Sequence, residues 1–185
     1  EAVAESTDEI VKICKQHDAM DVRVATSQAE RDLLWLGRKA AFGAMGRLTP
    51  NYYLQDTVVP RTKLPETLSR VGEIARDYKL EIANVFHAGD GNLHPLILFD
   101  RYKPGELEKV LNAGTEMLHW CVDVGGAISG EHGIGLEKKE HLTLMFSADD
   151  LAAMAGLKQS FDPTQYFNPG KVFPSGSGCG EIDSL

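Results

Sequence analysis

The spacing of apolar residues along the chain predicts a series of amphipathic helices. In each of them an apolar side chain recurs every three or four positions, which places these side chains on one helix face. Pro65 is expected in the first turn of one helix, where its missing N–H is tolerated. The predicted helices cover residues 7–17, 27–46, 63–80 and 106–124, and further helix is expected to about residue 160.

Shorter apolar runs between these helices predict β-strands. Residues 20–25 alternate apolar and polar side chains, and residues 51–60 are aromatic and β-branched up to Pro60. Two further apolar runs, 81–88 and 93–100, flank a glycine-rich turn. This order of elements is typical of an α+β fold in which helices cover one face of a largely antiparallel sheet. The small, polar tail, residues 174–185, is expected to be disordered.

Composition narrows the class of protein. A chain of 185 residues with 43% hydrophobic composition can bury one core, and 19 basic against 27 acidic residues give a net charge of -8, which disfavours nucleic-acid binding. No apolar run is long enough for a direct membrane span. Cys14, Cys121 and Cys179 are odd in number and irregularly spaced, which argues against a disulfide framework and for a reducing compartment. We therefore expect a cytoplasmic location. The start at Glu1 suggests a piece of a longer protein.

Two glycine-rich segments carry the residues most suited to chemistry. His87 and His94 flank the turn in HAGDGNLH, so adjacent strands would bring both rings to the same end of a sheet. Two imidazoles and one carboxylate can bind Zn, Mn or Fe and leave coordination positions open. Glu131, beside His132 in SGEHGIG, is the first candidate for the carboxylate, and Asp90 is the second. The alternative is a hairpin whose histidines have no metal.

Other conspicuous residues have simpler structural interpretations. Histidines in helical sequence are ordinarily structural, large apolar residues ordinarily form the core, and a run of charges is ordinarily a solvated helix face. These interpretations apply to His17, His119 and His141, to Trp35, Trp120, Met45 and Met117, and to residues 137–140.

Five motifs follow one another between residues 34 and 171: LWLGRKAAFGAMGRLTPNYY, VVPRTKLPETL, NVFHAGDGNLHPLILFD, GGAISGEHGIGLEKK and FDPTQYFNPGK. Together they resemble the C-terminal half of FAD-linked 2-hydroxy-acid dehydrogenases of the vanillyl-alcohol-oxidase type, in particular the glycolate oxidase (glycolate dehydrogenase) D-subunit type. The resemblance implies a ferredoxin-like α+β cap or substrate domain at residues 1–125. A glycine-rich active-site loop and a helical C-terminal segment follow at residues 126–173. It also implies that FAD is held mainly by an N-terminal domain absent from this chain.

The resemblance also implies roles for individual residues. His87, His94 and Glu131 correspond to ligands of a divalent metal, and His132 to the base that removes the hydroxyl proton of the substrate. Arg38 and Asn92 correspond to substrate-binding residues, with the arginine on the substrate carboxylate. Asn168 corresponds to a cofactor-binding position near the flavin.

One departure from the family pattern concerns the substrate. Relatives that oxidise a dicarboxylic hydroxy acid have a threonine and a lysine where this chain has Phe42 and Leu54. The resemblance therefore implies a small monocarboxylic 2-hydroxy acid, glycolate or D-lactate, as substrate. The expected partners are the chain's own FAD domain and further subunits of a glycolate oxidase complex, through which the protein could associate with a membrane. A stand-alone metal-dependent hydrolase and a non-catalytic, metal-stapled module are the alternatives.

Overall fold

The computed structural model describes residues 2–174, and the chain divides by its internal contacts into two compact units, Glu1–Ala44 and Met45–Leu185. The predicted tail lies outside the described residues from residue 175 onward. The family resemblance implies a different division, into a cap or substrate domain at residues 1–125 and an active-site loop with a helical segment at residues 126–173. This division stays a prediction.

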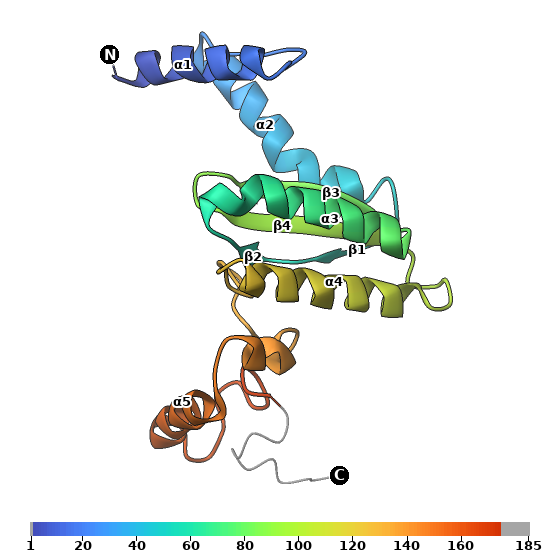
Figure 1. The fold of residues 1–185 in the computed structure, drawn as a ribbon, viewed down its shortest axis with the longest axis vertical. Helices are drawn as coiled ribbons and strands as arrows, with labels where there is room; N and C mark the ends of the chain where they lie inside the picture. The colour runs from blue at the N-terminus through green and yellow to red at the C-terminus, as the bar shows by residue number, and fades with distance from the viewer. Residues whose placement is uncertain (1, 175–185) are drawn as a thin grey trace. The chain divides into compact units, whose positions relative to one another are not determined.

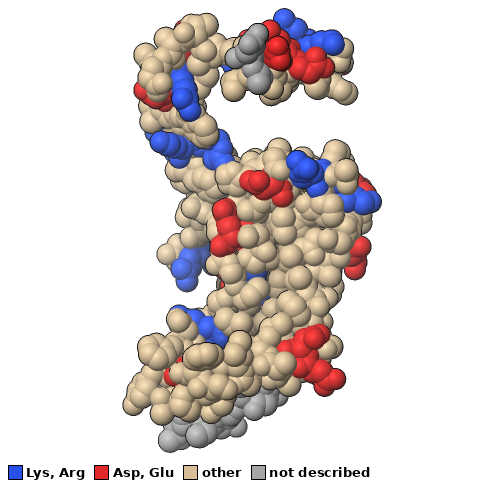
Figure 2. Space-filling view, turned by 90° about the vertical axis from the view of Figure 1, so that its left-hand side faces the viewer, with Lys and Arg blue, Asp and Glu red and all other residues tan. Residues whose placement is uncertain are grey.

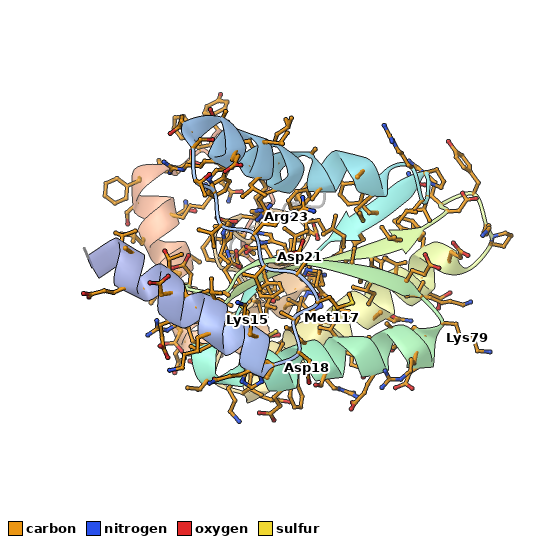
Figure 3. The ribbon with its side chains drawn as sticks, turned by 90° about the horizontal axis from the view of Figure 1, so that it is seen from above. Lys15, Asp18, Asp21, Arg23, Lys79 and Met117 are labelled. Carbon is orange, nitrogen blue, oxygen red and sulfur yellow. The ribbon has the colours of Figure 1, made fainter. Side chains whose placement is uncertain are left out.

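The first unit consists mainly of two helices, α1 (Ala2–Gln16) and α2 (Gln28–Met45), of which α2 extends one residue into the second unit. The strand predicted at residues 20–25 is wrong, because this segment is an irregular connection in which Arg23 pairs with Asp21 at 3.0 Å (Figure 3). Among the described residues of the first unit no strand lies beside it, and a strand without a partner has no hydrogen-bond ladder. Trp35 is 52% exposed, so its assignment to the core is also wrong within this unit.

The second unit is built around one long central strand. β4 (Asn92–Phe99) pairs antiparallel with β3 (Glu81–His87) on one side and with β1 (Asn51–Leu54) and β2 (Thr57–Val58) on the other. The strand predicted at residues 51–60 is thus two short strands. An antiparallel bridge between Val58 and Ala127 extends the sheet beyond β2. This connectivity is the ferredoxin-like arrangement. It confirms the predicted α+β fold.

Two helices cover one face of this sheet. α3 (Leu64–Tyr78), preceded by the short helix η1 (Arg61–Lys63), and α4 (Glu106–Asp123) pack against each other and against the strands (Figure 1). The predicted arrangement of helices on one face is confirmed. Met117 is 2% exposed in this core (Figure 3), as expected, and Trp120 packs at its edge. The main buried cluster comprises Val71, Ile74, Ile97, Val110, Ala113 and Met117.

The opposite face of the sheet is set by the strand alternation. Because Ile97 and Leu93 point toward the helices, His94 and Leu96 point away from them. Leu54 is paired with Leu96 and therefore shares the face of His94.

The C-terminal part of the second unit packs against the end of α4. The further helix predicted to about residue 160 is divided into η2 (Lys139–Leu144) and α5 (Ala148–Phe161), because Ser147 caps α5 in a reciprocal pair of hydrogen bonds with Asp150. A second cluster holds this part in place and comprises Leu118, Ile128, Leu142 and Leu151. The C-terminal segment is therefore anchored by apolar packing as well as by its connection to the loop.

Charged residues show no concentration of one sign on the visible surface. On the face drawn in Figure 2, lysine and arginine side chains are interspersed with aspartate and glutamate. Among the described residues, no helix is both long enough and apolar enough to cross a membrane.

Acidification is expected to destabilise the protein through His141. Its Nε2 lies 3.2 Å from Thr115 Oγ1, and burial, followed by the nearby charge of His119, lowers the pKa of His141 below its ordinary value. The His141 imidazole therefore binds a proton more readily in the unfolded chain than in the folded protein. Stability that is present above about pH 6.5 is lost as the pH falls.

Urea unfolding in the presence of a chelator, at about pH 7.5 and about pH 5.5, should show this loss in the free energy of unfolding. His141→Asn should reduce the loss, whereas His17→Asn, at an exposed position after α1, should leave it unchanged. An equal pH dependence in wild type and His141→Asn would exclude His141 as its source.

Candidate metal centre and acid–base site

The two strands of the hairpin carry the two predicted histidine ligands on the same sheet face. In the β3–β4 register His94 is opposite Val85 and His87 is opposite Asn92, so both imidazoles lie on the face away from α3 and α4. The ring centroids are 5.6 Å apart. The expectation that both rings meet at one end of the sheet is confirmed.

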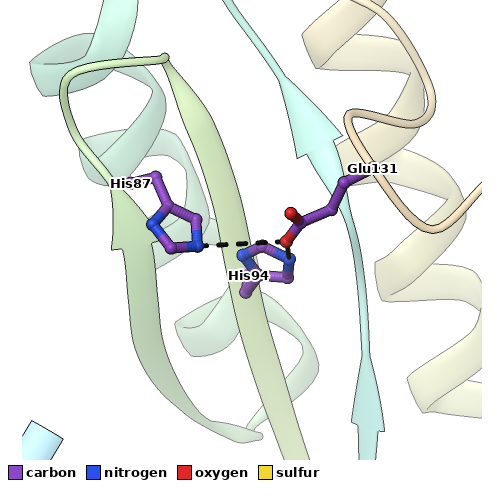
Figure 4. Close-up of side chains that lie close together, drawn as sticks. All are labelled: His87, His94 and Glu131. Atoms are coloured by element: carbon purple, nitrogen blue, oxygen red, sulfur yellow. Dashed lines mark ion pairs between the residues drawn. The ribbon is translucent and has the colours of Figure 1, made fainter.

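Glu131 joins these two rings from a distant loop. Its Oε1 atom is 2.8 Å from His94 Nε2 and 3.9 Å from His87 Nε2 (Figure 4). One ligand atom from each of the three residues lies within 4.8 Å of the other two. Asp90, the second candidate, is an exposed turn residue whose backbone N–H donates to His87 O. In the part of the chain that the structure describes, Glu131 therefore completes the group.

The chemistry of this donor set fits a divalent cation. Two imidazoles and a carboxylate are ligands of Zn, Mn and Fe, and three protein ligands leave room for further oxygen ligands. His94 is buried, and this burial lowers its pKa, which favours the neutral imidazole that binds metal. The side chains of His87 and Glu131 are 47% and 51% exposed, so the group is open to a small molecule on one side.

His132 and Asn92 lie beside this group. The His132 ring is 5.0 Å from that of His94, and its Nε2 is 3.9 Å from Glu131 Oε1. Asn92 is buried, and its Oδ1 has no hydrogen-bond partner among the described residues. A Cβ atom at Gly130 would lie 2.6 Å from that oxygen, so only glycine lets the loop approach Asn92 this closely.

Sequence reasoning missed Asp56, the residue that organises the Glu131 loop. Asp56 directly precedes β2, is 1% exposed, and accepts hydrogen bonds from Ser129 Oγ and from the backbone N–H groups of residues 130–132. Burial alone would raise its pKa, but the bonds from His132 N–H, Ser129 and Glu131 N–H, with the charge of Lys138, bring it below the ordinary value. The available signal was an acidic residue inside a segment, residues 51–60, that was otherwise expected to be a strand.

Lys138 corrects another expectation. The charged run 137–140 was expected to be a solvated helix face, yet Lys138 is 3% exposed. Its Nζ donates to the backbone carbonyls of Asp56 and Ile128, the latter at 2.8 Å. Burial lowers the pKa of Lys138, although Asp56 opposes the shift. Burial of the residue is tolerated because two carbonyl groups at the base of the loop accept hydrogen bonds from its ammonium group.

Comparison with known proteins places this arrangement in a family. Residues 1–172 match the family described as FAD linked oxidases, C-terminal domain. The chain belongs to this family. This FAD-linked oxidase domain is 44% identical over 183 residues to glycolate oxidase subunit GlcD of Escherichia coli K12. The aligned region covers 99% of this chain and 37% of that protein.

Other relatives have the same extent. The domain is 37% identical to glycolate oxidase subunit GlcD of Bacillus subtilis, over 94% of this chain and 37% of that protein. It is 30% identical to the mitochondrial D-lactate dehydrogenase [cytochrome] of Arabidopsis thaliana, over 92% of this chain and 30% of that protein. The FAD-linked oxidase domain thus spans 30–37% of the length of these relatives.

The remaining predicted residues lie apart from the metal group in the chain. Arg38 and Phe42 belong to α2 in the first unit, where both are half-buried. Asn168 lies after α5 with a positive φ of 50°, is exposed, and accepts a hydrogen bond from Lys171 Nζ at 3.2 Å. The substrate role of Arg38 and the cofactor role of Asn168 stay predictions.

Proposed function

We propose that this chain is the substrate- and metal-binding part of a flavin-dependent dehydrogenase that oxidises a small 2-hydroxy acid, glycolate, to the 2-oxo acid. The observation that carries the proposal is the convergence of His87, His94 and Glu131, with His132 beside them. Identity to the GlcD relatives, at 44% and 37%, favours glycolate over D-lactate, because the D-lactate dehydrogenase relatives are 30–34% identical.

Each group in the proposal has a separate task. A divalent cation held by His87, His94 and Glu131 would supply Lewis-acid polarisation of the substrate hydroxyl. His132 Nε2, which lies 3.9 Å from Glu131 Oε1, would take the hydroxyl proton as a general base. Arg38 would pair with the substrate carboxylate through its planar fork of donors, and Asn92 would lie against the substrate.

The flavin belongs to a part of the protein outside this chain in our proposal. FAD, held mainly by an N-terminal domain with Asn168 near it, would supply the acceptor for the substrate hydride. Protein partners would be further subunits of a glycolate oxidase complex, and the location would be the cytoplasm, with any membrane association through those subunits. The isolated chain would then be inactive, whereas a metal-dependent hydrolase would work without flavin.

The proposal is tested by substrate choice in the flavin-loaded holoenzyme. Glycolate should bleach the flavin absorbance under anaerobic conditions, whereas D-2-hydroxyglutarate should react at least about 10²-fold more slowly in kcat/KM. The reason is the family resemblance: relatives that oxidise a dicarboxylic hydroxy acid have a threonine and a lysine at these positions, where this chain has Phe42 and Leu54, which offer no polar group to a second carboxylate.

The double variant Phe42→Thr/Leu54→Lys supplies the control, because it should raise kcat/KM for D-2-hydroxyglutarate and lower it for glycolate. Equal kcat/KM of the wild type for both substrates would contradict the proposed specificity. A flavin that no 2-hydroxy acid reduces would contradict the function itself.

A further inference from the structure

Asp56 fills an anion-binding nest that the active-site loop forms with its own backbone. Asp56 Oδ2 lies 2.7 Å from Ser129 Oγ and 3.0, 3.1 and 2.8 Å from the backbone nitrogens of Gly130, Glu131 and His132. Successive N–H groups that point to one position bind an anion, commonly a phosphate or another external group. Here the anion is a buried carboxylate of the chain itself, so the loop conformation depends on it.

The same residue is connected to both ends of the loop and to the central strand. Lys138 Nζ donates hydrogen bonds to the backbone carbonyl groups of Asp56 and Ile128. These bonds connect residue 128 and residue 138, the two ends of the loop, to Asp56. The next residue in the chain, Thr57, pairs with Leu93 of β4, directly before His94. Asp56 Oδ1 lies 3.8 Å from His94 Nε2. Asp56 therefore links the loop that carries Glu131 and His132 to the strand that carries His94.

We propose that Asp56 is a positioning residue of the metal and acid–base groups, acting through the backbone of Gly130, Glu131 and His132; this inference rests on the proposed function. Two of the three N–H groups that Asp56 accepts belong to the residues whose side chains approach His94. Hydrogen bonds to a carboxylate are about twice as strong as those to a neutral acceptor. The carboxylate also places a second negative charge, after that of Glu131, 3.8 Å from His94 Nε2, which favours a divalent cation.

The test is Asp56→Asn in the flavin-loaded holoenzyme. Asparagine keeps the shape but has no charge, and its amide replaces acceptor lone pairs with two N–H donors. Titration with Mn²⁺ should show a rise of about 10–100-fold in Kd, the usual effect of losing an outer partner of a metal site. At saturating Mn²⁺, kcat for glycolate should fall at least about tenfold while KM changes by about twofold or less, since the displaced groups act on the chemical step.

Asp150→Asn is the matched control. Asp150 also accepts a backbone hydrogen bond, from Ser147 N at 2.9 Å, but it caps α5 and has no contact with the metal group. This variant should lower Tm while it leaves the Mn²⁺ Kd and kcat at wild-type values. If Asp56→Asn likewise lowers only Tm, its role is structural and the inference is overturned.

The outcomes separate this inference from the function on which it rests. A wild type that binds Mn²⁺ and oxidises glycolate, with Asp56→Asn equal to it in Kd and kcat, would overturn the inference alone. A wild type that binds no Mn²⁺ and oxidises no 2-hydroxy acid would overturn both.

If Asp56→Asn does not fold, Ser129→Ala provides the measurement. It keeps the carboxylate but removes the Ser129 hydroxyl, which donates to Asp56 and accepts from Gly133 N at 2.8 Å. The loss of these neutral hydrogen bonds should raise the Mn²⁺ Kd by about three- to tenfold. An unchanged Kd in a folded Ser129→Ala variant would overturn the inference.

Discussion

Replacement of His132 by alanine is expected to lower kcat for glycolate by about 10²–10⁴-fold, the usual contribution of a positioned general base. Bound metal should stay at the wild-type level, because His132 is outside the group formed by His87, His94 and Glu131. His132 is 46% exposed in its side chain, so the substitution should cost little stability. Turnover at saturating metal, elemental analysis and Tm, measured on the same preparation of holoenzyme, check these three expectations.

His119→Ala is a suitable control for this variant. His119 is an exposed histidine on α4 and is not a member of the metal group. Its loss should leave kcat and metal content unchanged. Wild-type turnover by His132→Ala would remove this residue from the role of base, and a simultaneous loss of metal would assign it to the ligand set instead.

Removal of either histidine ligand is expected to lower metal occupancy and, with it, turnover. Loss of a residue that hydrogen-bonds to a metal ligand typically raises the metal Kd by about 10–100-fold. Loss of a direct ligand should raise the Kd for Mn²⁺ by more than this. The two variants should differ in stability, because the side chain of His94 is 4% exposed and that of His87 is 47% exposed. His94→Ala opens a space in a packed region and should lower Tm, whereas His87→Ala should lower occupancy with little change in Tm.

This difference makes His87→Ala the more informative of the two variants. A folded His87→Ala protein with wild-type metal stoichiometry by elemental analysis would contradict the ligand assignment. Tm measured with and without Mn²⁺ adds a second readout, since a ligand that binds only the folded state raises Tm. That increase should be present in the wild type and reduced in both variants.

Much of the second unit follows from local sequence pattern. The helix at residues 63–80 and the strands on either side of the glycine turn were predicted within a few residues, because each buries one face and therefore shows the period of its own geometry. Residues 20–25 have the same kind of alternation but form no strand. A β-strand needs a second strand to pair with, and the alternation of apolar and polar residues does not show whether such a partner exists.

The candidate site divides in the same way. The convergence of His87 and His94 could be predicted because the strand period and a short turn determine it locally. The sequence ranked Glu131 above Asp90 as the carboxylate, but the structure was needed to decide between them, because Glu131 is 37 residues beyond His94 in the chain. The roles of His132, Arg38, Asn92 and Asn168 stay predictions, and the His132→Ala variant tests the first of them.

The sequence by itself determined the helix-covered antiparallel sheet of the second unit and the pairing of two histidines at its end, because the local pattern of apolar and polar residues defines the helices and the hairpin. Only the tertiary structure decided that Asp56 and Lys138 are buried and hold the loop that carries Glu131. The hydrogen bonds of Asp56 join residues 73–76 positions apart, and that of Lys138 to Asp56 spans 82. Burial of a charge is tolerated only where such distant donors and acceptors meet, and no local pattern of apolar and polar residues records that meeting.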